Sequence, residues 1–107
     1  MALIQKSFDS YLIYYRSGPG TSEPRAFINF FQANSYVGGV RFIAEGIPLP
    51  ANAGTPSSIE IYYSLPQFND VVGILRYEKP LWLLFDSGTL VGYLSTSAEP
   101  IGEQEGV

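Results

Sequence analysis

The stretch that decides the fold is residues 58–77, SIEIYYSLPQFNDVVGILRY, because the spacing of its apolar side chains changes part-way along it. From Ile59 to Tyr63 every second side chain is apolar, which is the period of a strand. From Phe68 onward the apolar residues fall three and four positions apart, which is the period of a helix. One segment therefore predicts both kinds of element, in the order strand and then helix.

The helix has a recognisable start. Ser64 and Gln67 are spaced as a capping box, and Pro66 stands in the first turn, where its missing N–H does no harm. These signals predict a helix over residues 66–78. The alternative is a strand through residues 71–77, which are rich in β-branched and aromatic side chains, and Gly73 weakens both interpretations.

Strands dominate the rest of the chain, separated by loops rich in glycine and proline. Gly38-Gly39 inside one strand indicates a bulge or a close approach of another backbone or of a ligand. With residues 58–63, the predicted strands are 8–16, 26–33, 36–45, 81–86 and 89–96. About six strands and one helix predict an α+β fold with a predominantly antiparallel sheet; the alternative is an all-β small barrel or sandwich.

Length and composition predict the number of domains and the cellular compartment. The 107 residues fit one domain, which we place at 1–96, followed by a flexible acidic tail at 97–107 that holds three of the ten acidic residues. The net charge is −4 for the whole chain and close to zero without that tail. The chain has no cysteine, no leading segment of signal-peptide type and no apolar run near the roughly 20 residues of a membrane span. We expect a cytoplasmic protein with no membrane partner.

The apolar pattern predicts association. Residues 8–16, 26–33 and 81–86 are apolar on both faces, and one helix of about 13 residues spans only about 20 Å, enough to cover one side of a small sheet. A second copy of the chain, closure into a barrel or a bound partner would cover the other side. A symmetric dimer is the commonest solution among soluble proteins, and we expect a homodimer.

The sequence lacks the residues that several kinds of catalytic and metal-binding chemistry require. Without histidine or cysteine, the usual zinc, copper and iron ligand sets, the Ser-His-acid and Cys-His catalytic groups and thiol redox chemistry are unavailable. The acidic residues of the body are scattered and match no calcium-binding loop. We therefore expect no metal, no cofactor and no enzymatic activity, with a histidine-free carboxylate enzyme as a minor alternative.

Aromatic residues accompanied by arginines form the only constellation that indicates binding. We select Tyr14, Arg16, Phe30, Arg41 and Tyr62 as candidate binding residues. Aromatic and arginine side chains are enriched at protein interfaces, and sheet proteins also use them to stack single-stranded bases. The first hypothesis is a small non-catalytic binding or assembly module acting as a homodimer. The alternative is a regulator that binds single-stranded nucleic acid.

Overall fold

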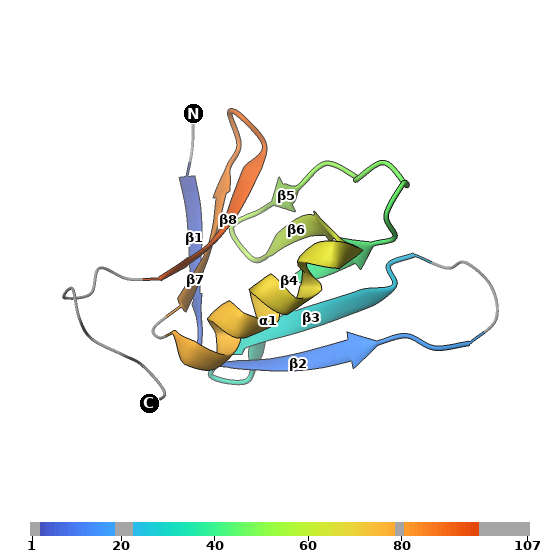
Figure 1. The fold of residues 1–107 in the computed structure, drawn as a ribbon. Coiled ribbons are helices and arrows are strands. Elements are labelled where there is room, and N and C mark those ends of the chain that lie inside the picture. Colours follow the sequence, from blue (N-terminus) through green and yellow to red (C-terminus); the bar gives the residue numbers. More distant parts are fainter. Residues whose placement is uncertain (1–2, 19–22, 79–80, 97–107) are drawn as a thin grey trace, which may run out of the picture.

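The structure is a computed structural model that describes residues 3–18, 23–78 and 81–96, arranged as two sheets and one helical segment (Figure 1). The three-stranded sheet has the order β1 (Leu3–Phe8), β7 (Leu81–Asp86) and β8 (Val91–Thr96). The five-stranded sheet has the order β2 (Ser10–Tyr15), β3 (Ala26–Gln32), β4 (Ser35–Ile43), β6 (Ile59–Ser64) and β5 (Ala53–Gly54). Neighbouring strands are antiparallel except β4 and β6, which are parallel.

The predicted α+β class with a mostly antiparallel sheet is confirmed. The described residues form eight strands, and neither of their sheets closes into a barrel. The helical segment runs as a 3₁₀ turn, η1 (Leu65–Gln67), followed by α1 (Phe68–Tyr77), so the helix interpretation of residues 66–78 is also confirmed. The predicted tail at 97–107 lies outside the described residues.

The prediction of one strand over residues 8–16 is wrong at its start. The chain bends at Asp9 and passes from the three-stranded sheet into the five-stranded sheet, so β1 and β2 are separate strands. The N–H of Asp9 donates to the carbonyl of Phe31 at 2.9 Å, and its carboxylate accepts from the N–H of Ala33 at 3.2 Å. These bonds fix the bend against the turn between β3 and β4.

The helix begins where its start signal predicts. The side-chain oxygen of Gln67 accepts from the backbone N–H of Ser64 at 3.0 Å and from its hydroxyl at 3.2 Å. Val71 and Leu75, one turn apart on α1, are buried. The apolar stripe of the helix therefore faces the sheet.

The helix and the three-stranded sheet cover the same face of the five-stranded sheet, which we call the packed face (Figure 1). Phe68 of α1 meets Phe42 of β4 edge-on, with ring centroids 5.0 Å apart. The ring of Phe8, from β1, stacks on Phe30 of β3 at 4.2 Å. One core thus joins both sheets and the helix.

The paired glycines of β4 serve close backbone approach, and the strand carries a bulge beside them. The β3–β4 register shifts between Phe30 and Phe31. An added Cβ at Gly38, which has a positive φ of 144°, would collide with the carbonyl oxygen of Ile59. The prediction of a bulge or a close approach at these glycines is confirmed.

Candidate interaction surface

The second face of the five-stranded sheet, which we call the open face, is defined by strand register. Residues directly opposite each other on paired strands share a face, and Phe27, Asn29 and Phe31 of β3 alternate with buried neighbours. The described residues place neither helix nor sheet over this side (Figure 1). The open face comprises Ser10, Leu12, Tyr14, Phe27, Asn29, Phe31, Tyr36, Arg41, Glu60 and Tyr62.

Aromatic rings pair across the strands of the open face. Tyr14 stacks on Phe27 with centroids 4.7 Å apart and planes 17° apart. The guanidinium carbon of Arg41 lies 5.6 Å from the centroid of the same Phe27 ring, within cation–π distance. Phe31 and Tyr36 meet edge-on at 6.1 Å. These contacts hold the rings in fixed orientations relative to one another.

The charges at the centre of the open face are largely balanced. Arg41 Nη2 lies 3.6 Å from Glu60 Oε2. Arg41 Nη1 and Asn29 Oδ1 are enclosed and have no hydrogen-bond partner among the described residues. Each lies 3.2 Å from the place a Cβ on Gly39 would occupy, so this glycine leaves room for both groups. Because Glu60 offsets Arg41, the open face is mainly apolar and aromatic in its chemistry.

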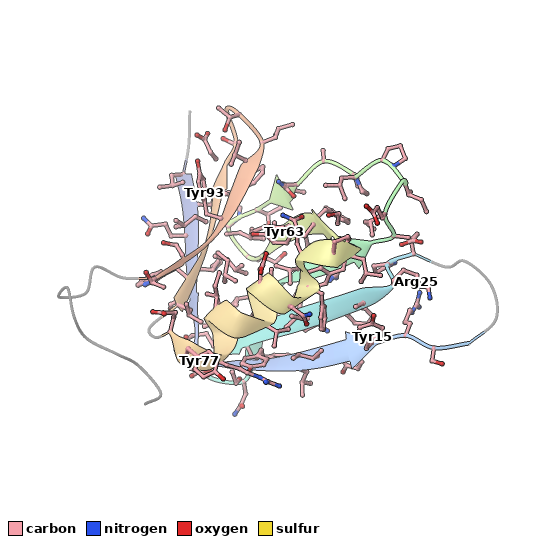
Figure 2. The ribbon with its side chains drawn as sticks, viewed as in Figure 1. Tyr15, Arg25, Tyr63, Tyr77 and Tyr93 are labelled. Carbon is pink, nitrogen blue, oxygen red and sulfur yellow. The ribbon has the colours of Figure 1, made fainter. Side chains whose placement is uncertain are left out.

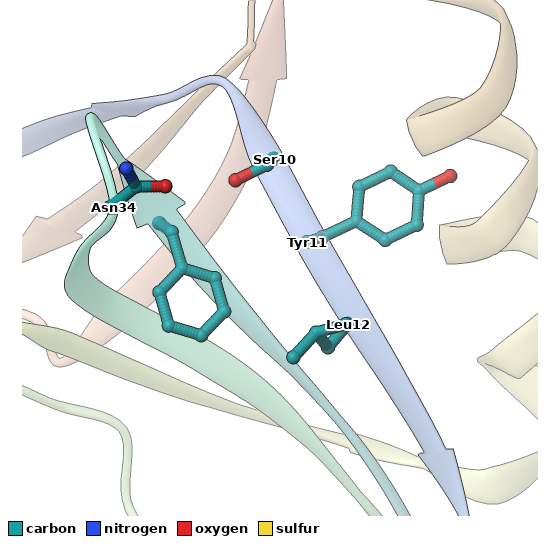
Figure 3. Close-up of a pocket in the computed structure, with 5 residues that line it drawn as sticks. Ser10, Tyr11, Leu12 and Asn34 are labelled. Carbon is teal, nitrogen blue, oxygen red and sulfur yellow. The ribbon is translucent and has the colours of Figure 1, made fainter.

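A hollow of about 310 Å³ lies beside the turn between β3 and β4 (Figure 3). Its lining residues are Ser10, Tyr11, Leu12, Phe31 and Asn34. Tyr11 points its ring towards the helix, whereas Leu12 projects from the other side of β2 (Figure 3). The hollow is open, and its lining includes no ionisable carboxylate or amine.

Strand β2 forms one edge of the five-stranded sheet and is the most exposed apolar element described. Its segment Leu12–Tyr15 presents four consecutive large side chains with exposed fractions of 52%, 39%, 44% and 62%. Figure 2 shows Tyr15 near the end of this strand, next to Arg25. No charged residue and no proline interrupts Ser10–Tyr15, so β2 lacks the devices that usually protect an edge strand.

The opposite edge of the same sheet is protected. Strand β5 has only two residues, and beyond it the side chain of Asn52 accepts from the N–H of Tyr62 at 2.8 Å. The Asn52 amide also donates to the carbonyl of Leu90 at 3.1 Å, which ties this edge to the turn of the three-stranded sheet. Of the two edges of the five-stranded sheet, only β2 is therefore unprotected.

A second exposed apolar group lies on the outer side of the three-stranded sheet and is less continuous. Leu3, Val91 and Tyr93 are exposed there, and Figure 2 shows Tyr93 on β8. Leu3 and Val91 stand on either side of Asp86, because both pair with it in register. The carboxylate interrupts the apolar surface at that point, whereas β2 has no such interruption.

The structure brings together three of the five residues selected from the sequence. Tyr14, Arg41 and Tyr62 lie on the open face. Arg16 follows β2 directly, and its guanidinium lies 3.5 Å from the carbonyl of Pro24. Phe30 belongs to the core, with no exposed surface, so it does not join them.

Sequence reasoning missed Leu12, Phe27 and Phe31. The signal for the two phenylalanines was present in AFINFFQ, where Phe27 and Phe31 share alternate positions with the polar Asn29. A polar residue within one alternating set identifies the side of a strand that is less deeply buried. The same signal assigns Phe30 to the packed side.

Comparisons with known proteins provide no family for the chain: no family model, no curated protein and no solved structure matches it. Within residues 3–18, 23–78 and 81–96, no three acidic, histidine or cysteine residues gather into a possible metal site. No helix in the same part of the chain is long and apolar enough to cross a membrane. The functional proposal therefore rests on the geometry of the open face and of β2.

Proposed function

We propose that this chain is a small non-catalytic assembly module that works as a homodimer joined along β2. The observation that carries the proposal is the run Leu12–Tyr15, four exposed large side chains on an edge strand with no charge and no proline. Such an edge offers apolar surface and unpaired backbone groups in the same place. A second copy of the same strand satisfies both needs at once.

The chemistry of the surface supports binding without catalysis. The residues gathered on the open face are aromatic and aliphatic, around one arginine that is balanced by one glutamate. Aromatic rings supply large, rigid contact area, which is why they are enriched at protein interfaces. Pairing along this edge also removes part of the exposed surface of these four side chains from water, which provides a hydrophobic driving force for dimer formation.

The oligomeric state and one matched pair of variants test the proposal. Light scattering after size exclusion, at tens of micromolar protein, is expected to give the mass of two chains. The double variant Leu12→Lys/Ile13→Lys is expected to give the mass of one chain, because lysine on an edge strand opposes pairing. Circular dichroism shows whether each variant keeps its fold.

The control carries the same two substitutions elsewhere. Ile47 and Leu49 lie in the loop before β5. Their exposed fractions, 43% and 48%, are similar to those of Ile13 and Leu12. Ile47→Lys/Leu49→Lys is expected to remain a dimer. A wild-type monomer, or equal behaviour of the two double variants, would show that β2 does not join two copies.

Binding of single-stranded nucleic acid is the second candidate function, and one set of side-chain contacts favours it. Tyr14, Phe27 and Arg41 stack in series on the open face, an arrangement onto which a base could be added. The ion pair with Glu60 reduces the charge available for phosphates. Anisotropy of a labelled oligonucleotide at low salt tests this function. Saturable binding that Tyr14→Ala and Arg41→Ala both weaken would support it, and unchanged anisotropy would exclude it.

A further inference from the structure

We infer that the two copies pair antiparallel along the free edge of β2, with Ile13 of each copy opposite the partner's Ile13. The two five-stranded sheets then become one continuous sheet. The inference rests on the proposed homodimer and specifies its geometry. It follows from the direction of the backbone groups of β2, from the positions of two charges and from the continuity of the open face.

The backbone groups that face the free edge belong to alternate residues. The N–H of Arg16, at the end of β2, donates to the carbonyl of Arg25 at 3.0 Å, so Arg16 faces inward towards β3. In an antiparallel ladder inward and outward residues alternate. Tyr11, Ile13 and Tyr15 therefore direct their N–H and C=O groups away from β3, where a partner strand can bond to them.

The number of bonds selects one register. A symmetric interface joins the same surface of both copies, so outward residues must oppose outward residues. With Ile13 opposite the partner's Ile13, Tyr11 lies opposite the partner's Tyr15, and every outward residue is paired. In the next symmetric register on either side, one outward residue of β2 lies opposite a residue that is outside the partner's β2 and therefore loses its bonds within the strand.

Two charges favour the antiparallel arrangement. Asp9 precedes β2 and Arg16 follows it, so the strand has an anionic end and a cationic end. In the inferred register Arg16 lies opposite the partner's Ser10 and next to the partner's Asp9. The two opposite charges meet at each end of the interface. A parallel arrangement would instead bring like charges together.

The pairing also extends the open face. A two-fold axis perpendicular to the sheet leaves the helices of both copies on one side and the two open faces on the other. In this register Leu12 lies opposite the partner's Tyr14, so the aromatic surface continues across the junction without a gap. The dimer would thus present one surface, built from both copies, to any further partner.

Disulfide cross-linking tests the register directly, because the chain has no cysteine of its own. Opposite residues at a hydrogen-bonded antiparallel position have Cα atoms about 5.5 Å apart, within the roughly 4.4–6.8 Å that a disulfide spans. Under a mild oxidant, Ile13→Cys is expected to form a linked dimer on a non-reducing gel. Ile47→Cys, in the loop before β5, is the control for random collision and is expected to stay unlinked.

Two further variants fix the register without ambiguity. In the inferred dimer the Cα atoms of Leu12 and the partner's Leu12 are about 8 Å apart, two residue steps along the strand and one strand spacing across, too far for a disulfide. The same holds for Tyr14. Leu12→Cys alone and Tyr14→Cys alone are expected to stay unlinked, whereas an equimolar mixture of the two should link.

The outcomes separate the register from the proposed function. Self-linking of Leu12→Cys would show a register slipped in one direction, and self-linking of Tyr14→Cys a slip in the other; either result overturns the inference. A protein that is dimeric by light scattering but links at none of these positions would disprove pairing along β2, and with it the interface in the proposed function, while the homodimer itself would remain. A monomer would overturn both.

Discussion

Phe30 and Phe31 are neighbours on β3, yet the first is enclosed against Phe8 on the packed face and the second lies half-buried on the open face. The same comparison extends across the whole sheet. One side is covered by a helix and by a second sheet, and the other carries ring pairs of its own. Aromatic side chains thus build the core on one face and remain partly exposed on the other, and the strand register determines which ring goes to which face.

Replacing each of these phenylalanines tests the comparison with the largest expected effect. Phe30→Ala removes a ring from a close-packed core and is expected to lower the free energy of unfolding by about 3–5 kcal/mol. Phe31→Ala is expected to lower it by about 1 kcal/mol, within the range of less buried sites. Urea unfolding at one fixed protein concentration measures both, since dimer formation would make stability concentration-dependent. Equal losses would show that the open face is packed after all.

A glycine on each covering element sharpens the description of the packed face. An added Cβ at Gly92 of β8 would lie 2.7 Å from a side-chain carbon of Ile61, so Gly92→Val is expected to cost about 1–3 kcal/mol through overpacking. Gly73 of α1 has no atom within 4 Å of its added Cβ, and Gly73→Ala is expected to add about 0.5–1 kcal/mol. Thermal unfolding of the two variants should move in opposite directions. A stabilised Gly92→Val would mean that the sheets are not in close contact there.

The smallest effect concerns Tyr63, whose side chain lies on the packed side of β6. Burial raises the pKa of its phenol above the ordinary value of 10.0. The folded protein therefore holds this proton more tightly than the unfolded chain, and the contribution to stability is complete below about pH 10. As the pH rises from there through the raised pKa, the contribution is lost. Urea unfolding from pH 8 to 11 should show a steeper alkaline loss in the wild type than in Tyr63→Phe, and parallel profiles would contradict it.

The sequence predicts local elements well where their signals are local. The helix is specified by Ser64, Pro66 and Gln67 at its start and by the spacing of Val71 and Leu75, and the structure has it there. The bend at Asp9 carries no glycine or proline, so Phe8 was assigned to the strand 8–16, and the remainder of β1 was not predicted. The bend depends on bonds to the turn between β3 and β4, which are distant in the chain.

The candidate surface was predictable only in part. Alternation places Tyr14 and Tyr62 on definite sides of their strands, but it does not say which side the helix covers. That depends on how β6 leads into η1 and on the three-stranded sheet packing on the same side as the helix. Phe30 was selected where Phe31 belongs, although Asn29, which lies on the same side of β3 as Phe31, distinguishes the two rings. The exposure of β2 follows from its place at the end of the sheet order, which no local pattern encodes.

The pairing of β1 with β7 has a consequence for how the chain reaches its native state. β1 stands at the start of the described residues, and its partner follows the helix. During synthesis Ile4 and Phe8 therefore have no pairing strand until β7 has left the ribosome. Closing the long loop between β1 and β7 also carries an entropic cost. We expect slow folding, typical of topologies dominated by distant contacts.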